Sequence, residues 1–197
     1  MKINKWLLTP LLGTLIGFSV FAASNKTLTT LHHVGDCYGG GVIFYVNNTA
    51  NAPVGQRGLI AGASDVVGSF SWDTNPAGQD VPKTQTTLFS GAANSATIAS
   101  QIGARAQAVA ASRHYTDGTY HDWYLPSQNE LSTLYFNALT HGPKFWTTCS
   151  GSAPSAATYW SSTQDGVINA WGVSFAGGVI VVAHKNNPFL VRPIRAF

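Results

Sequence analysis

Charged residues are scarce in this chain of 197 residues. Asp, Glu, Lys and Arg make up 10% of the sequence, against roughly 25% in an average soluble protein. The formal net charge is +3, and it falls to about +1 when Lys2 and Lys5 of the N-terminal segment are set aside. No Lys/Arg cluster follows along the chain, so the composition excludes binding of nucleic acid through bulk charge.

Enzyme and metal signatures are also missing. The sequence has neither His-Glu-x-x-His nor Gly-x-Ser-x-Gly, and no glycine-rich loop leads from a strand into a helix. The acidic residues are scattered singly, whereas Ca²⁺ takes several oxygen ligands. His114 and His121 lie near Asp122, but such histidines more often form local hydrogen bonds. Paired carboxylates for glycoside cleavage depend on the fold and stay open here. We expect a binding protein without catalysis, cofactor or metal.

Only two cysteines are present, Cys37 and Cys149. In an exported protein such a pair most simply forms one disulfide. It would close a long loop and stabilise the fold by about 4–5 kcal/mol in the chain-entropy model. The alternative is a free, nucleophilic Cys149 served by a histidine such as His141.

Residues 1–23 have the pattern of a secretory signal peptide, with Lys2 and Lys5 ahead of an apolar run and small residues at its end. A membrane anchor is the alternative, but the run is short for a span and is interrupted by Gly, Pro and polar residues. We expect cleavage, and hence a secreted or cell-surface protein with no membrane span afterwards. Residues 24–36 are polar and Thr-rich, as in a short linker.

Two helices are expected. Ser127 occupies an N-cap position and Glu130 follows three residues later, which is the capping-box pattern. Pro126 restricts that helix to the residues after it. The second helix is expected over Gly91 to Arg113, where apolar residues recur on one face.

The remaining segments show β pattern or loop composition. Strands are expected at 42–46, 58–61, 159–163, 170–175, 179–183 and 189–197. Pro193 inside the last strand indicates an edge or a bulge. Residues 62–90 form a long irregular loop for which Trp72 is the expected anchor. Residues 144–157 are expected to form another loop, which carries Cys149.

Seven short segments occur in a specific order along residues 37–197. They are Gly-Gly-Gly-Val-Ile-Phe-Tyr-Val at 39–46, Gly-Leu-Ile-Ala at 58–61, Gly-Ala-Ala-Asn at 91–94, Asp-Trp-Tyr-Leu-Pro-Ser at 122–127 with Glu130-Leu131, Tyr-Trp-Ser-Ser-Thr at 159–163, Ala-Trp at 170–171, and Val-Arg-Pro-Ile-Arg-Ala-Phe at 191–197. Together they resemble the C-terminal domain family named after the Legionella collagen-like adhesin.

The resemblance implies an α+β, C-type-lectin-like fold over residues 37–197. Such a fold has a small antiparallel sheet, two flanking helices and long irregular loops, and its first and last strands pair. The adhesin that names the family binds sulfated glycans and forms a trimer through a collagen-like stalk. This chain has no Gly-X-Y repeat, so a stalk-driven trimer is not implied and a homo-oligomer is left open. It also has an insertion around Cys149.

Calcium-dependent lectins of this fold use Glu-Pro-Asn or Gln-Pro-Asp with Trp-Asn-Asp, and none of these tripeptides occurs here. The resemblance therefore predicts a calcium-independent, lectin-like adhesin for host or matrix glycans of the glycosaminoglycan type. The alternative is an exported effector or scaffold domain that binds a host surface protein through an exposed apolar patch.

Ligand-binding candidates are aromatic, amide and basic residues near loop ends, because sugars stack on aromatic faces and accept hydrogen bonds from Asn, Arg and Lys. They are Lys144, Trp146, Asp165, Asn169, His184, Lys185 and Asn186. The alternative is that Trp146 belongs to the core and that the others are solvated loop residues.

Overall fold

The structure, a computed structural model, describes residues 31–197. The signal peptide predicted for residues 1–23 lies outside the described residues, as does the first part of the predicted linker. The end of that linker belongs to the folded domain. The N–H of Gly35 donates to the carbonyl of Ile43, and the N–H of Ile43 donates to the carbonyl of Asp36. The domain therefore begins slightly before Cys37.

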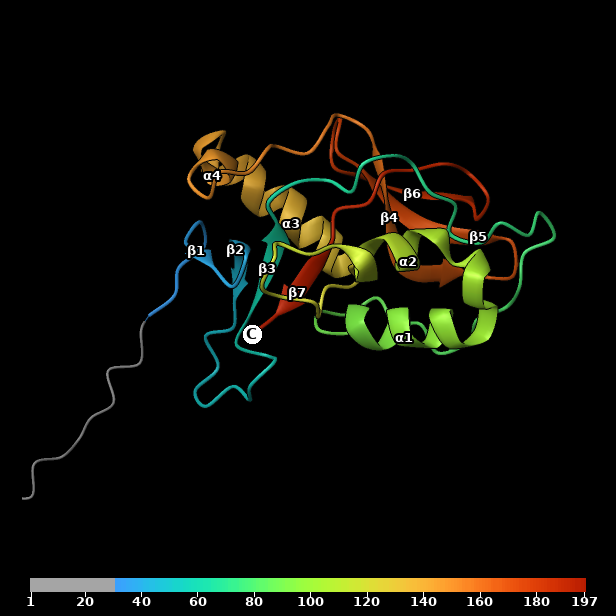
Figure 1. The fold of residues 1–197 in the computed structure, drawn as a ribbon, viewed down its shortest axis with the longest axis horizontal. Helices are drawn as coiled ribbons and strands as arrows, with labels where there is room; N and C mark the ends of the chain where they lie inside the picture. Colours follow the sequence, from blue (N-terminus) through green and yellow to red (C-terminus); the bar gives the residue numbers. More distant parts are fainter. Residues whose placement is uncertain (1–30) are drawn as a thin grey trace, which may run out of the picture. The chain divides into compact units, whose positions relative to one another are not determined.

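Four strands form the first sheet, in the order β1-β2-β3-β7 with antiparallel neighbours (Figure 1). Their bounds are β1 Cys37–Tyr38, β2 Gly41–Val46, β3 Gly58–Gly62 and β7 Ile194–Ala196. The expected pairing of the first and last strands is wrong, because β7 pairs with β3 and places Arg195 opposite Ile60. β1 folds back on β2 as a hairpin and takes its outer edge, which leaves the free edge of β3 for β7.

A second antiparallel sheet has the order β4-β5-β6. Its strands are β4 Thr158–Asp165, β5 Asn169–Ser174 and β6 Val179–His184. The expectation of one small sheet is thus corrected to two within residues 31–197. The segment predicted as a single strand at 189–197 divides between them: Phe189 and Leu190 form isolated bridges to Phe70 and Tyr159, and only Ile194–Ala196 joins the first sheet. Pro193 lies at the division, since it has no N–H for a continuous ladder.

Four α-helices and one 3-10 turn occur in the described chain, where the sequence predicts two helices. They are α1 Gly91–Ile102, η1 Gly103–Arg105, α2 Gln107–His114, α3 Gln128–His141 and α4 Lys144–Thr147. The single helix expected over 91–113 is wrong because Gly103 takes a φ of +55°, which no helix continues through. The capping box of α3 is confirmed: Ser127 Oγ accepts from the Glu130 N–H, and Glu130 Oε2 accepts from the Ser127 N–H at 2.7 Å.

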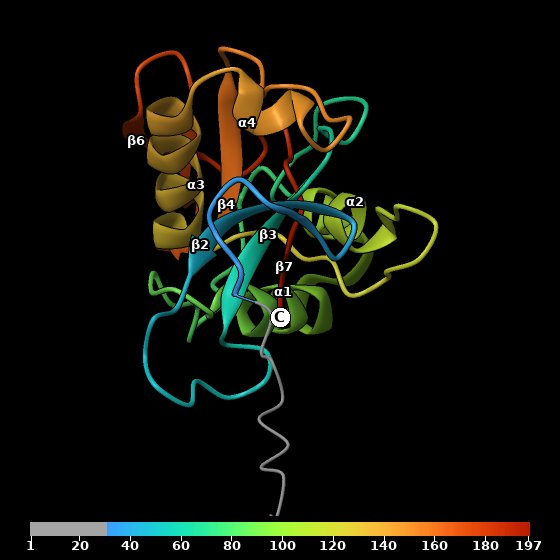
Figure 2. The same cartoon turned by 90° about the vertical axis from the view of Figure 1, so that its left-hand side faces the viewer.

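The helices cover opposite faces of the second sheet. Tyr159 and Val173 pack in one cluster with Leu131 of α3, whereas the neighbouring Trp160 packs in another cluster with Ile98 of α1. Adjacent strand residues point to opposite faces, so one strand serves both cores. Figure 2 shows α3 on the left and α1 below.

The predicted anchor Trp72 and the predicted disulfide are both confirmed. Trp72 is fully buried and its indole N–H donates to the carbonyl of Ser161 at 3.0 Å, so it fixes the loop over residues 62–90 against β4. Cys37 and Cys149 form a disulfide that joins β1 to the segment after α4. Within residues 31–197, no helix is both long and apolar enough to cross a bilayer.

Candidate functional site

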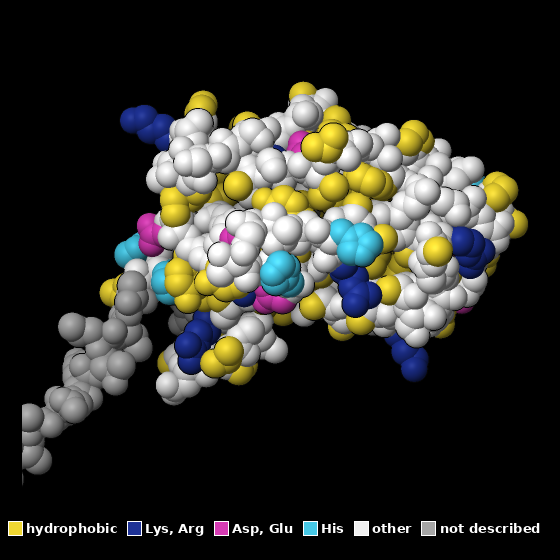
Figure 3. Space-filling view, in the orientation of Figure 1, with side chains coloured by type: hydrophobic (Ala, Val, Ile, Leu, Met, Phe, Trp, Pro, Cys, Tyr) yellow, Lys and Arg dark blue, Asp and Glu magenta, His cyan; other side chains and the backbone are white. Residues whose placement is uncertain are grey.

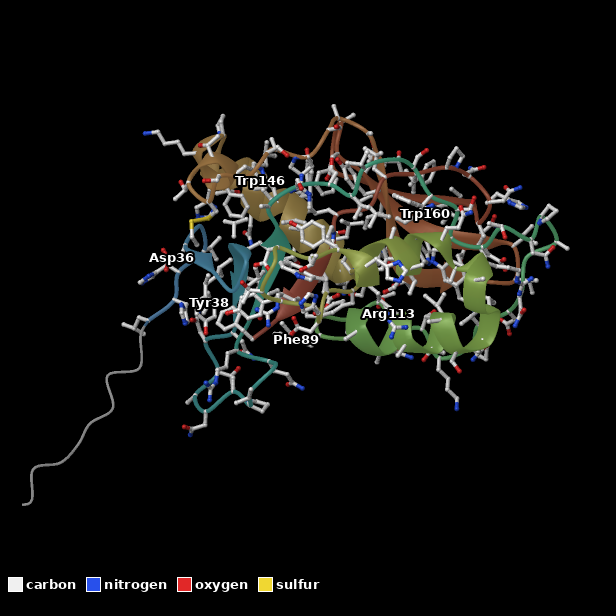
Figure 4. The ribbon with its side chains drawn as sticks, viewed as in Figure 1. Asp36, Tyr38, Phe89, Arg113, Trp146 and Trp160 are labelled. Atoms are coloured by element: carbon white, nitrogen blue, oxygen red, sulfur yellow. A yellow bond between two sulfur atoms is a disulfide. The ribbon has the colours of Figure 1, made fainter. Side chains whose placement is uncertain are left out.

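Lys144 and Trp146, the first two predicted ligand residues, both lie on α4 and have different environments. Lys144 is exposed at the N-terminus of this short helix. Trp146 is only 3% exposed and packs in the core, with the guanidinium of Arg192 4.8 Å from its ring centroid (Figure 4). We therefore reassign Trp146 from a candidate ligand residue to a core residue.

The other five predicted residues lie at one end of the second sheet, at the ends of its strands or just after β6. Asp165 pairs with Asn169 across β4 and β5, and Asn169 pairs with His184 across β5 and β6. Asp165 and Asn186 are exposed, while Asn169 and His184 are half-buried. The structure thus brings these five residues to one end of the second sheet, and Lys144 does not join them.

Lys185 is fully buried, which removes it from the candidate ligand contacts. Its Nζ donates to the carbonyls of Gln79, Gly166 and Val167 and to Gln164 Oε1, at 2.7 to 3.0 Å. Burial lowers the pKa of Lys185 to about 8. The ammonium fills a cage of oxygens and ties the long loop to the β4–β5 turn, so its role is structural.

A groove with basic side chains at its rim lies between α1 and α2. Its volume is about 410 Å³, within the range of small-ligand sites. The floor consists of small side chains, and the rim carries basic ones. The lining residues are Ala99, Gly103, Ala106, Val109, Ala110, Arg113, His114 and His121. Small residues on both helices leave the space that larger side chains would fill.

The rim of this groove carries one arginine and two histidines. Arg113 and His114 come from the last turn of α2, and His121 comes from the loop that follows. All three are exposed, and none of the eight lining residues is acidic. Figure 3 shows His and Lys/Arg side chains around an apolar floor on this face, and Figure 4 places Arg113 between α2 and α1. Within residues 31–197, Arg113 forms no ion pair.

Asp122, the acidic residue that follows the rim residue His121, forms an ion pair with Arg195. Both carboxylate oxygens of Asp122 accept from Arg195, at 2.7 and 2.8 Å. The same two hydrogen bonds hold the pKa of Asp122 below its usual range. Asp122 therefore stays ionised while its charge is balanced by Arg195, which leaves the positive charge of Arg113 free for a ligand.

Two other aspartates also face an arginine. Arg192 Nε donates to Asp65 at 2.7 Å, and Arg105 Nε lies 3.6 Å from Asp73. Glu130 caps α3. No group of three or more His, Cys, Asp or Glu side chains among residues 31–197 is arranged to hold a metal ion.

Sequence reasoning named His114 and His121 but missed the groove and Arg113. A usable signal is the spacing of Ala99, Gly103, Ala106 and Ala110, which places small residues along the face where two helices meet. That signal depends on the helix break at Gly103, which the periodicity of the segment hides.

Comparison with known proteins gives a family and a fold. The model of the Lcl C-terminal domain family matches residues 63–195. Among solved structures, the chain is similar to a fimbrial protein from Bacteroides ovatus ATCC 8483, with 15% sequence identity and a TM-score of 0.56. That similarity covers 80% of this chain and 44% of the fimbrial protein, so the chain spans less than half of that protein's length. No curated protein matches the chain.

Proposed function

The chain belongs to the Lcl C-terminal domain family, and we propose that it is an adhesin-like domain, secreted or on the cell surface, that binds acidic glycans without calcium. The observation that carries this proposal is the groove between α1 and α2, with Arg113, His114 and His121 on its rim and no acidic lining residue. The structural neighbour is a fimbrial protein, which supports a surface role.

The groove suits an acidic sugar in two ways. The guanidinium of Arg113 offers paired N–H donors that match the geometry of a sulfate or carboxylate group. His114 and His121 supply further donors on the same rim, while Ala and Val side chains on the floor contact the apolar face of a sugar ring. The ligand class is therefore a sulfated or uronic-acid-containing glycan, as in glycosaminoglycans.

The pairing of three of the acidic residues supports calcium-independent binding. Asp65, Asp73 and Asp122 each face an arginine, so a Ca²⁺ ion would have to displace a guanidinium to gain a carboxylate ligand. We propose binding without catalysis for the same reason, because these carboxylates are held in ion pairs. The C-type-lectin-like classification of the fold is part of this proposal and rests on the family resemblance.

The test is the affinity of the exported, disulfide-bonded protein for a heparin-derived hexasaccharide, measured by titration calorimetry in EDTA at two salt concentrations. We expect binding that survives EDTA and weakens with salt. Arg113→Gln should weaken it about tenfold, the loss of one charge-assisted hydrogen-bond pair. Arg57→Gln, which removes an exposed arginine outside the groove, should leave it unchanged.

Two results would overturn the proposal. Loss of binding in EDTA would reveal a required metal, and equal affinities of Arg113→Gln and the wild type would exclude the groove. If the folded protein binds no acidic glycan at all, the alternative of a protein partner gains, because several large hydrophobic side chains are exposed on α3 and β6.

A further inference from the structure

β6 is an edge strand with no protective feature. It pairs with β5 on one side, in a register without shifts, and no described strand lies on its other side. Its sequence, Val-Ile-Val-Val-Ala-His, has no proline and no Lys, Arg, Asp or Glu. Natural proteins usually guard such edges with a charge, a proline or a bulge, because the free N–H and C=O groups pair readily with another strand.

Five of the eleven exposed large hydrophobic side chains among residues 31–197 lie on β6 and α3. Their exposed fractions are 60% for Val179, 43% for Ile180, 44% for Val182, 56% for Phe136 and 65% for Leu139. The two elements approach each other where Gly178, just before β6, packs on the ring of Tyr135 in α3. Exposed apolar surface of this kind is typical of an interaction site.

We propose that β6 is a dimerisation edge, on which a second copy of this chain adds its own β6 in antiparallel orientation. The choice of a second copy follows from charge. Two β6 strands bring no like charges together, since neither carries a charged side chain and Lys185, which follows β6, is buried with its ammonium inside the domain. A charged partner segment would find no complement on this edge.

The strand sequence is also self-complementary about a twofold axis. A twofold axis perpendicular to the sheet, midway between the Val181 residues of the two copies, keeps equivalent faces of the two strands on the same side. It places Ile180 of one copy opposite Val182 of the other. The half-exposed apolar side chains of each copy then cover those of its partner, and the free main-chain groups of both edges form hydrogen bonds. The two three-stranded sheets become one sheet of six strands, and the assembly closes at two copies.

The mass of the exported, disulfide-bonded protein, measured by sedimentation velocity over a range of concentrations, tests the proposal. We expect a dimer, and we expect the double variant Ile180→Lys with Val182→Lys to be a monomer, because four ammonium groups then meet across the axis. Val67→Lys is the matched control, since Val67 is 96% exposed and lies in the long loop; it should remain a dimer. Circular dichroism establishes that each variant is folded.

Variants of opposite charge distinguish contact at the β6 edge from indirect effects of the substitutions. The variant with Glu at both positions should also be a monomer alone, and mixing it with the Lys variant should restore a dimer of mixed mass in native mass spectrometry. A wild type that is monomeric at all concentrations, an assembly larger than two copies, or a dimer that persists in the Lys variant would each overturn the proposal. A mixture that stays monomeric would also contradict it. None of these readouts involves the glycan groove.

Discussion

Lys185 places its ammonium over the indole of Trp72, with Nζ 4.4 Å from the ring centroid. The same Nζ donates to the carbonyl of Gln79 at 2.7 Å. Trp72 and Gln79 belong to the long loop, whereas Lys185 follows β6, so one buried cation joins the loop to the second sheet. The ammonium thus occupies the centre of a group of oxygen atoms that would otherwise be available to a metal ion.

Replacing Lys185 with Met should destabilise the domain by about 3 kcal/mol, because the carbonyls that now accept from Nζ would be left buried without a donor. Equilibrium denaturation in urea measures the change. Lys144→Met is the control, and as a surface substitution it should change the free energy of unfolding by less than about 0.5 kcal/mol. Equal stabilities of the two variants would show that the oxygen cage contributes nothing.

Glu130 predicts a pH dependence of stability. Burial raises the pKa of Glu130 to about 7, while an unfolded Glu titrates near about 4.3. Between these values the folded protein holds a proton that the unfolded chain releases, so the free energy of unfolding falls as pH rises. The contribution is complete below about pH 4.3, is lost above about pH 7, and amounts to about 4 kcal/mol.

Denaturation curves from pH 5 to pH 8 for wild type and Glu130→Gln isolate this contribution, since every other titrating group is shared. The wild type should lose stability over this interval relative to the variant, because Gln does not titrate. A constant difference between the two proteins at all pH values would contradict the assignment.

Gly178 should tolerate no side chain. It has a φ of +71°, and a Cβ there would lie 2.2 Å from the ring of Tyr135. Gly178→Ala should therefore cost about 2 kcal/mol, from left-handed backbone strain together with displacement of the ring. Gly177→Ala is the matched control, because a Cβ at Gly177 meets no atom within 4 Å. Thermal unfolding of the two variants compares them directly, and similar midpoints would disprove the close packing of this turn on α3.

Local signals in the sequence predicted local structure well. The cap of α3 follows from Ser127 and Glu130 alone, because both partners lie within four residues. Trp72 was recognisable as an anchor because a large apolar side chain within a long irregular loop must find a core. The even pair of cysteines, together with the expectation of export, was enough to predict the disulfide.

Features that depend on distant segments could not be predicted. Lys185 has the appearance of a solvated loop residue in the sequence. The acceptors for its ammonium come from Gln79 and from the β4–β5 turn, which are distant in sequence. Arg113 was missed because its groove requires the helix break at Gly103, and a positive φ at one glycine leaves the apolar periodicity of the segment intact. Pairing of β7 with β3 was hidden because it depends on which edge the short hairpin of β1 covers.

The most direct test of the central claim is the place where an acidic glycan contacts the domain. Amide chemical shifts of the ¹⁵N-labelled protein, recorded during titration with a heparin-derived hexasaccharide in EDTA, locate the contact residue by residue. We predict that the shifts concentrate on α2, on the adjoining end of α1 and on the loop around His121. Shifts confined to the β4–β5 turn and residues 184–186, or an unchanged spectrum, would contradict the account.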